Sequence, residues 1–325
     1  MSGAKKAGCI MRLLITGGAG FIGSNFVHYI LEQYPDYEVI NLDALTYAGD
    51  LENLAGVMEN PRHRFVQGRI EDGALMGELM EGIDVVVNFA AESHVDRSIL
   101  EPQVFIETNV VGTQVLLDAA LQREIKRFYQ ISTDEVYGAL ELDSPERFNE
   151  GSLLRPNSPY AASKAAADLL VRAYHRTYGL PVVISRCSNN YGPRQHAEKF
   201  IPTVILNALH DKPVPLYGDG LYVRDWIHVL DHCRAVDMVM HKGKAGEVYN
   251  ISADNEWANI ELARKILQIM EKTEDLITSV RDRPGHDRRY ALDGGKAGLE
   301  LDWKPSISFE QGLDETVRWY SELGK

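Results

Sequence analysis

Cysteine is scarce in this sequence. Only three of 325 residues are cysteines, Cys9, Cys187 and Cys233, and they lie far apart along the chain. An odd number at so low a density argues against a disulfide framework and favours a reducing, cytoplasmic location. No His or Cys pair stands at the spacing of a metal site, and His94 has no such neighbour, so we expect no metal centre.

Basic residues are in the minority. The chain has 34 Lys and Arg against 47 Asp and Glu, which leaves a formal net charge of −13. A chain this acidic is poorly suited to binding nucleic acid or an anionic membrane surface. An anionic ligand therefore requires a local cluster of cations.

Long hydrophobic runs are missing too. The longest apolar stretches have the length of strands, so we expect no transmembrane segment and no membrane partner. The first ten residues lack the apolar segment of a secretory signal. We expect residues 1–10 to be a loose extension and the fold to begin at Met11. The Gly-x-Ser-x-Gly turn of a serine hydrolase is also absent.

What the sequence does contain is a regular alternation of strands and helices. Strands are predicted at 11–16, 38–42, 64–70, 84–90, 128–131 and 181–185, and helices at 109–121 and 159–178. This alternation is typical of an α/β protein with a doubly wound parallel sheet, the Rossmann architecture.

Beyond Cys187 the pattern becomes irregular. Residues 188–202 are polar, whereas 231–240, 260–272 and 309–323 are helical in pattern and 247–251 is a strand that could return to the main sheet. We therefore predict a smaller C-terminal lobe interleaved with the first part. The Rossmann domain would comprise residues 11–188 and about 226–252, and the lobe residues 189–225 and 253–325.

A glycine-rich turn follows the first predicted strand. Gly18-Ala19-Gly20-Phe21-Ile22-Gly23 fits G-x-G-x-x-G, and Asp43 ends the next strand about 20 residues later. Strand, glycine turn, helix, strand and acidic residue form the full context of a dinucleotide site, with the pyrophosphate at the helix N-terminus. Asp43 would accept hydrogen bonds from ribose hydroxyls and repel a 2′-phosphate, so NAD is predicted rather than NADP.

Two adjacent carboxylates follow another strand. Thr133, Asp134 and Glu135 come directly after the apolar run 128–131, at the edge of the sheet where ligands bind. Neighbouring side chains on a strand diverge, so the two carboxylates share one site only if the strand ends there and the chain turns. The pair then suits a general acid and a general base; the alternative is a solvated acidic strand end.

Tyr160 and Lys164 are spaced to share one face of a helix. A phenol has a pKa near ~10, which a neighbouring ammonium and an oxidised nicotinamide would lower. The pair would then deprotonate an alcohol during hydride transfer, although two residues at helical spacing are also common by chance. Further along, Lys199, Arg224 and the segment 281–289 concentrate cations in an acidic chain, which favours a diphosphate ligand over a solvated loop.

Together these motifs resemble the extended short-chain dehydrogenase/reductase family and, within it, the dTDP-glucose 4,6-dehydratases. The resemblance runs from Met11 to the last helix, and epimerases of the superfamily lack the Asp134-Glu135 pair. The motifs are TGGAGFIGS (16–24), LTYAG (45–49), AAESHVDRSI (90–99), STDEVYG (132–138), YAASK (160–164), SNNYGPRQ (188–195), EKFIP (198–202), VRDW (223–226) and DRPGHDRRYA (282–291).

The resemblance implies a lyase that retains NAD and forms dTDP-4-keto-6-deoxyglucose, a precursor of rhamnose and other deoxysugars. Thr133 would orient the sugar 4-hydroxyl and Tyr160, with Lys164, would take its proton while C4 is oxidised. Glu135 would remove the C5 proton, and Asp134 would protonate the leaving C6 hydroxyl before hydride returns to C6.

The resemblance also implies the binding residues. The cofactor would be bound by Gly17, Gly20, Phe21, Ile22, Gly23, Asp43, Ala44, Leu45, Thr46, Ile70, Phe89, Ala90, Ala91, Thr108, Tyr160, Lys164 and Asn190. The nucleotide sugar would be bound by Ser93, Thr133, Asn189, Lys199, Phe200, Pro215, Tyr217, Arg224, Asn259, Arg283 and His286. Family members are homodimers through two helices per subunit, for which 109–121 and 159–178 are the candidates.

Two positions depart from the family pattern. The family usually has an acidic residue before Ile70, near adenine, where this chain has Arg69; Phe200 stands where Leu is common. Three alternatives stay open: a dehydratase of a UDP-, CDP- or GDP-sugar, a 4-epimerase that needs no acid pair, and a non-catalytic NAD-binding regulator, since fold alone does not determine function.

Overall fold

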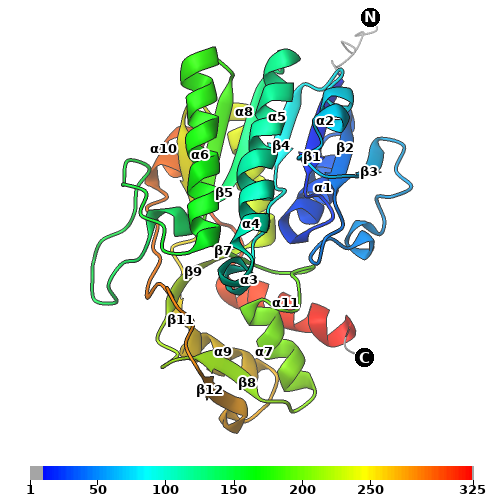
Figure 1. Cartoon of the computed structure of the whole chain (residues 1–325). Coiled ribbons are helices and arrows are strands. Elements are labelled where there is room, and N and C mark those ends of the chain that lie inside the picture. Colours follow the sequence, from blue (N-terminus) through cyan, green and yellow to red (C-terminus); the bar gives the residue numbers. More distant parts are fainter. Residues whose placement is uncertain (1–9, 324–325) are drawn as a thin grey trace, which may run out of the picture.

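A seven-stranded sheet forms the centre of the protein, a computed structural model that describes residues 10–323. Its strand order is β10-β6-β5-β4-β1-β2-β3, and every neighbouring pair is parallel (Figure 1). The predicted doubly wound sheet is thereby confirmed. The strands are β1 (Met11–Thr16), β2 (Tyr37–Asp43), β3 (His63–Gln67), β4 (Val85–Asn88), β5 (Arg127–Thr133), β6 (Val182–Cys187) and β10 (Val248–Ile251).

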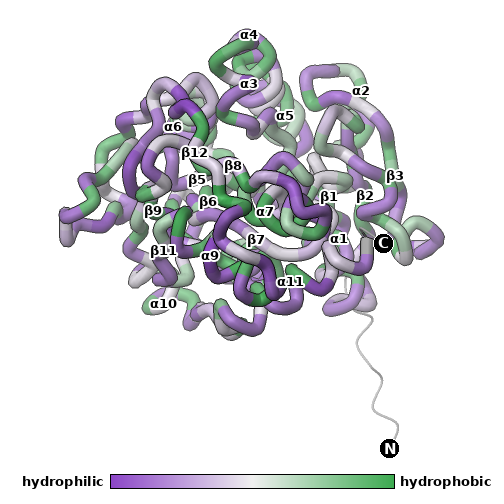
Figure 2. Tube along the Cα trace, turned by 90° about the horizontal axis from the view of Figure 1, so that it is seen from below, coloured by the Kyte–Doolittle hydropathy of each residue, from purple (hydrophilic) through white to green (hydrophobic). Residues whose placement is uncertain are grey.

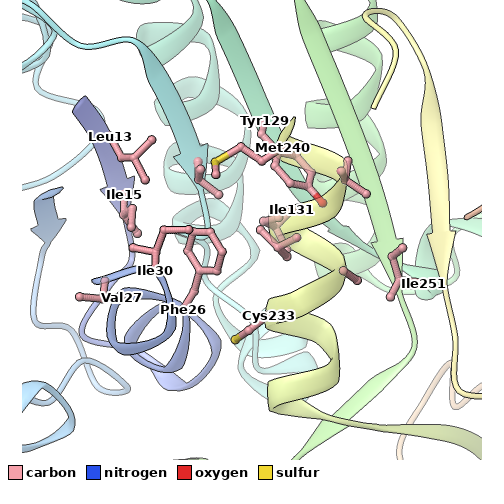
Figure 3. Close-up of a cluster of buried hydrophobic side chains, with 14 of the residues drawn as sticks. Leu13, Ile15, Phe26, Val27, Ile30, Tyr129, Ile131, Cys233, Met240 and Ile251 are labelled. Atoms are coloured by element: carbon pink, nitrogen blue, oxygen red, sulfur yellow. The ribbon is translucent and has the colours of Figure 1, made fainter. Parts of the chain in front are cut away.

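One face of the sheet is covered by α1 (Phe21–Gln33), α8 (Val229–Lys242) and α10 (Gly295–Leu301). Apolar side chains of α1 and α8 meet those of the strands in the core that Figure 3 shows, with Phe26 and Ile30 beside Ile15. Because the inner strands of a parallel sheet are covered on both faces, β4, β5 and β6 are buried along nearly their whole length.

The other face is covered by α2 (Gly73–Leu79), α5 (Thr113–Gln122) and α6 (Pro159–Tyr178). Both faces of the sheet are thus closed to solvent, so the carboxyl ends of the strands are the edge where a ligand can enter.

A continuous helical run precedes β5. Helix α4 (Pro102–Phe105), a π-helical segment (Ile106–Gly112) and α5 follow one another, with α3 (Val95–Leu100) just before them. By length and composition alone, Pro102–Gln122 is apolar enough to cross a membrane, with a mean hydropathy of 1.3. The run is not one continuous apolar stretch, because Glu107, Asn109 and Asp118 interrupt it. Leu116, Leu117 and Ala120 of the run are fully buried against the sheet, and a core helix of this kind passes the same test.

The remaining elements form a smaller lobe below the carboxyl ends of the strands (Figure 1). It contains the sheet β11-β9-β7, the pair β12-β8 and a core of its own between α7, α9 and α11, which lie together in Figure 2. Its elements are β7 (Asn189–Tyr191), α7 (Phe200–Leu209), β8 (Val214–Tyr217), β9 (Val223–His228), β11 (Glu256–Ala258), α9 (Asn259–Ile269), β12 (Ile277–Val280) and α11 (Phe309–Leu323).

Several predicted boundaries shift. The third strand ends at Gln67 rather than Ile70, and residues 188–202 are not irregular throughout, since β7 and the start of α7 fall within them. Pro202 is tolerated in α7 because it lies in the first turn, where its missing N–H has no partner to lose. The strand at 248–251 does return to the main sheet, beside β6.

Candidate active site

A cavity of about 310 Å³ opens at the carboxyl ends of the strands. It brings together most of the predicted site residues from both parts of the chain. Those lining it are Gly17, Gly20, Phe21, Ile22, Gly23, Asp43, Ala44, Thr46, Ile70, Phe89, Ala90, Ala91, Ser93, Thr108, Thr133, Asp134, Glu135, Tyr160, Lys164, Asn189, Asn190 and Lys199.

The glycine-rich turn between β1 and α1 is packed so closely that no side chain fits at Gly17 or at Gly23. Gly17 has a φ of +70°, and a Cβ there would lie 2.6 Å from the backbone nitrogen of Ala90. A Cβ on Gly23 would lie 2.2 Å from the Gly17 carbonyl oxygen. Helix α1 begins at Phe21 with no side chain capping its N-terminus. Its first N–H groups therefore face the cavity without a side-chain acceptor, a geometry that fits a pyrophosphate.

Asp43 is held in place at the end of β2. Its carboxylate is 8% exposed and accepts hydrogen bonds from the backbone N–H of Ala19 at 2.9 Å and of Leu45 at 2.8 Å. Burial raises the pKa of Asp43, and these backbone donors oppose that rise. The oriented carboxylate is suited to accept from ribose hydroxyls. Leu45, which does not line the cavity, contributes through its backbone N–H.

Strand β5 ends at Thr133, and a 3-10 turn over Asp134–Tyr137 follows. The chain therefore turns at the point where it must turn for both carboxylates to share one site. The Thr133 hydroxyl donates to Asp134 Oδ1 at 3.1 Å and accepts from the Glu135 N–H at 3.3 Å. The turn brings both carboxylates to the same cavity, which regular strand geometry would prevent.

The two carboxylates differ in their surroundings. Asp134 is 2% exposed, and burial together with the neighbouring Glu135 raises its pKa to about 8. Burial also raises the pKa of Glu135, but three cations, Arg283, Arg224 and Lys199, oppose that rise. Carboxyl groups whose surroundings differ in this way can take different roles, one as a proton donor and the other as a base.

Tyr160 and Lys164 lie on the first turns of α6, which Ser158 caps through a 3.1 Å hydrogen bond from the Ala161 N–H. The predicted lowering of the Tyr160 pKa, which includes the charge of oxidised nicotinamide, stays a prediction. Burial and then Glu135 raise the pKa of Tyr160 well above its usual value. The Lys164 ammonium, whose pKa burial lowers, donates to the Ile131 carbonyl at 2.7 Å instead.

A buried hydrogen-bond network, which the sequence analysis did not predict, joins the segment of Asp134 and Glu135 to that of Tyr160 and Lys164. The guanidinium of Arg186 donates to Asp168 at 2.9 Å and to the Tyr137 hydroxyl at 2.9 Å. Tyr137 in turn donates to Asn250 Oδ1 at 2.8 Å. Asp168 follows Lys164 by one helical turn, and Tyr137 closes the turn that carries Glu135. The spacing of Asp168 from Lys164 was the only signal of this network in the sequence.

The predicted cations of the lobe gather near Glu135 but do not line this cavity, apart from Lys199. Lys199 donates to the Ser93 carbonyl at 3.0 Å, and Arg283 lies 3.5 Å from Asp96. Arg224 is 5% exposed and donates to the carbonyl of Asp287 at 2.8 Å. The contacts of Lys199 and Arg283 tie the lobe to the segment that follows β4, whereas that of Arg224 lies within the lobe.

Other predicted substrate residues lie around these cations. Tyr217 donates to Asp96 at 3.0 Å, and its ring lies 5.8 Å edge-on from that of His286. Phe200, Pro215 and Asn259 belong to the lobe and are not among the cavity-lining residues.

Two arginines of the basic segment have structural partners. Arg288 pairs with Asp219 at 2.9 Å, and Arg289 pairs with Glu256 at 2.6 Å. His94, whose role was open, accepts from the Arg97 N–H at the start of α3 and lies 3.6 Å from Glu198. Among residues 10–323 no group of three or more His, Cys, Asp or Glu side chains could hold a metal ion.

The chain is similar to known proteins over nearly its whole length. The model of the GDP-mannose 4,6 dehydratase family matches residues 14–316. A dTDP-glucose 4,6-dehydratase of Xanthomonas campestris is 51% identical, covering 94% of this chain and 92% of its own length. The low-salt glycan biosynthesis protein Agl12 of Haloferax volcanii is 54% identical, over 95% of this chain and 98% of its own.

A solved structure resembles the whole chain. DesIV, a dTDP-glucose 4,6-dehydratase from Streptomyces venezuelae crystallised with NAD and TYD, superposes with a TM-score of 0.94 at 53% identity. The match covers 96% of this chain and 97% of DesIV.

Proposed function

This chain belongs to the dTDP-glucose 4,6-dehydratase family, and from that premise we propose that it is an NAD-dependent lyase forming dTDP-4-keto-6-deoxyglucose from dTDP-glucose. The observation that carries the proposal is the acid pair. Asp134, whose pKa burial and Glu135 raise to about 8, stands in the same cavity as Tyr160 and beside Glu135, where Arg283, Arg224 and Lys199 oppose the rise in pKa that burial causes. Oxidation alone needs only the tyrosine, whereas elimination of water needs both carboxyl groups.

The cofactor part of the cavity suits NAD. The glycine turn and the N-terminus of α1 would hold the pyrophosphate, and Asp43 the adenosine ribose. When bound, oxidised nicotinamide supplies a hydride acceptor that later returns the hydride, and a positive charge beside the phenol of Tyr160. The remaining contacts would come from Ala44, Leu45, Thr46, Ile70, Phe89, Ala90, Ala91, Thr108 and Asn190.

In the oxidation half, Thr133 orients the sugar 4-hydroxyl and Tyr160 accepts its proton. Lys164 donates to the carbonyl of Ile131 and keeps a positive charge close to the phenolate that forms. Burial and Glu135 raise the pKa of Tyr160. The bound cofactor and substrate would therefore have to supply the interactions that stabilise the phenolate.

In the elimination half, the new C4 ketone acidifies the C5 proton. Glu135 removes that proton, since Arg283, Arg224 and Lys199 favour its ionised form. Asp134 protonates the C6 hydroxyl, which leaves as water. The surroundings of the two carboxyl groups thus differ in the sense that the two steps need, with the proton favoured on Asp134 and cations beside Glu135.

The nucleotide sugar would extend from this cavity into the lobe. We propose that residues 11–188 and about 226–252 bind NAD and that 189–225 and 253–325 bind the substrate. Lys199, Arg224 and Arg283 supply the charge that a diphosphate needs in an acidic chain. The other substrate contacts would be Ser93, Asn189, Phe200, Pro215, Tyr217, Asn259 and His286.

Incubation with dTDP-glucose tests the function. We expect a product lighter by one water, detected by mass spectrometry, with less turnover of UDP-, CDP- and GDP-glucose measured in parallel. A product of unchanged mass that contains dTDP-galactose would contradict the dehydratase and indicate a 4-epimerase. Preferred turnover of another nucleotide sugar would move the assignment to that substrate.

We further propose a cytoplasmic homodimer that binds neither nucleic acid nor membranes. Apolar side chains are exposed on α3, on the π-helical segment and on α6. Leu100 is 79%, Ile106 47% and Leu169 54% exposed. A second copy of the chain would cover them through the Asn109–Leu121 and Pro159–Tyr178 segments. Light scattering of the purified protein should give twice the 36.4 kDa chain mass; a monomer at micromolar concentration would contradict this.

A further inference from the structure

The cavity continues past Asp43 to the end of β3, the edge strand of the main sheet. The backbone N–H of Gly68 donates to the Asp43 carbonyl at 3.0 Å, so the segment after β3 lies directly beside the residue proposed to bind ribose. If the pyrophosphate lies at the glycine turn and the ribose at Asp43, the purine base lies over residues 68–71. This placement rests on the proposed binding of NAD.

Two charged side chains line this end of the cavity, Arg69 and Glu71. Glu71 is engaged, because its Oε1 accepts from the Thr108 hydroxyl at 2.8 Å. The Arg69 guanidinium lies 3.9 Å from the same carboxylate, beyond hydrogen-bond distance, and its side chain is 59% exposed. Its charge is paired with Glu71 and also opposes the rise in the pKa of Glu92, a further carboxylate of the lining. Within residues 10–323 the Arg69 side chain donates no hydrogen bond, so its N–H groups are available to a base.

A guanidinium offers five N–H donors and no acceptor. The amino group at C6 of adenine is also a donor, so the two groups do not pair. A 6-oxopurine presents acceptors at both O6 and N7, which arginine binds in a bidentate manner. A carboxylate at this position would have the opposite preference, accepting from the adenine amino group and repelling O6.

We propose that Arg69 determines the base specificity of the dinucleotide site and favours a 6-oxopurine over adenine. Nicotinamide hypoxanthine dinucleotide should therefore bind at least as tightly as NAD. The contact is exposed, so one added hydrogen bond is expected to change affinity about fivefold rather than by orders of magnitude.

Titration calorimetry on NAD-stripped protein tests this with NAD, nicotinamide hypoxanthine dinucleotide and NADP. The deciding quantity is the Kd of nicotinamide hypoxanthine dinucleotide divided by the Kd of NAD. A substitution that weakens the binding of both dinucleotides equally leaves this ratio unchanged. The ratio should be one or lower for the parent and rise at least tenfold in Arg69→Asp. Arg69→Gln introduces an amide that both donates and accepts hydrogen bonds. Its Kd ratio should lie between those of the parent and Arg69→Asp.

Arg64→Asp is the matched control. Arg64 is exposed on β3 and outside the cavity, so this variant makes the same charge change and should keep the parental ratio. A parent that binds NAD at least fivefold more tightly, or an unchanged ratio in Arg69→Asp, would overturn the proposal. So would tighter binding of NADP, which would assign Arg69 to a 2′-phosphate. If no dinucleotide binds, the NAD assignment itself fails and this inference with it.

Discussion

Replacement of Glu135 by glutamine separates the redox half of the reaction from the elimination half. Gln has the same shape as Glu but cannot accept the C5 proton. In the protein, Arg283, Arg224 and Lys199 favour the ionised carboxylate, so the substitution removes the base. It keeps the Tyr160 and Lys164 side chains and removes a charge that raises the pKa of Tyr160, which does not hinder oxidation at C4. Loss of a general base costs roughly a hundred- to ten-thousand-fold in rate, or about 3 to 5 kcal/mol of barrier.

The expected phenotype is an arrested intermediate. Glu135→Gln should still oxidise C4, so bound reduced cofactor should accumulate in a single-turnover absorbance trace at 340 nm (a property of reduced nicotinamide) while C5 takes up no deuterium from solvent. Tyr160→Phe should form no reduced cofactor at all. Asp134→Asn should permit C5 exchange and slow the loss of water.

Glu141→Gln serves as the matched control, because Glu141 is an exposed carboxylate outside the cavity. It should turn over like the parent. If Glu135→Gln works within a few-fold of the parent, or forms no reduced cofactor, then the division between Tyr160 and Glu135 is wrong. A 4-epimerase would then be the next function to test, since it requires only the Tyr160 half.

Three further predictions concern proton transfer, cofactor binding and stability. Asp134 donates a proton and has a pKa of about 8, so the elimination rate should fall as pH rises through that value, about tenfold per unit above it; a rate that increases from pH 7 to 9 would contradict its role as the acid. Asp43→Ala should weaken NAD binding in calorimetry by about ten- to a hundredfold, through the loss of charge-assisted hydrogen bonds, and unchanged affinity would remove Asp43 from the site. Arg186→Met leaves the buried Asp168 carboxylate unpaired, so denaturant unfolding should show a loss of about 3 to 5 kcal/mol; the double variant with Asp168→Leu should recover much of it, and a stable single variant would show that the pair contributes little.

Local patterns were sufficient for much of the fold. Three predicted ranges, 11–16, 159–178 and 309–323, coincide with β1, α6 and α11. Each has a strong local signal: an apolar run before glycines, a Ser-Pro start, or a wide apolar stripe on a helix. The two elements β7 and β9 had no comparable signal. Asn189 of β7 pairs with Trp226 of β9, which is distant in the sequence. A strand of three residues such as β7 is stabilised by partners of this kind rather than by propensity.

The basic segment shows how tertiary contacts redistribute similar residues. Arg283, Arg288 and Arg289 look alike in the sequence. In the folded protein, Arg288 and Arg289 pair with Asp219 and Glu256, whereas Arg283 pairs with Asp96 and its charge also acts on Glu135. No spacing rule separates them, because their partners come from distant elements.

The sequence by itself determined the α/β class, the glycine turn with Asp43, and the identities of the Thr133, Asp134, Glu135, Tyr160 and Lys164 side chains, since each depends on short-range spacing. The tertiary structure decided how the two carboxyl groups of the acid pair differ. Burial and Glu135 raise the pKa of Asp134 to about 8, whereas cations of the lobe oppose the rise at Glu135, and both the burial and the cations come from residues far away in the chain. It also decided the surroundings of Tyr160, where the cost of burying a phenolate and the charge of Glu135 raise the pKa.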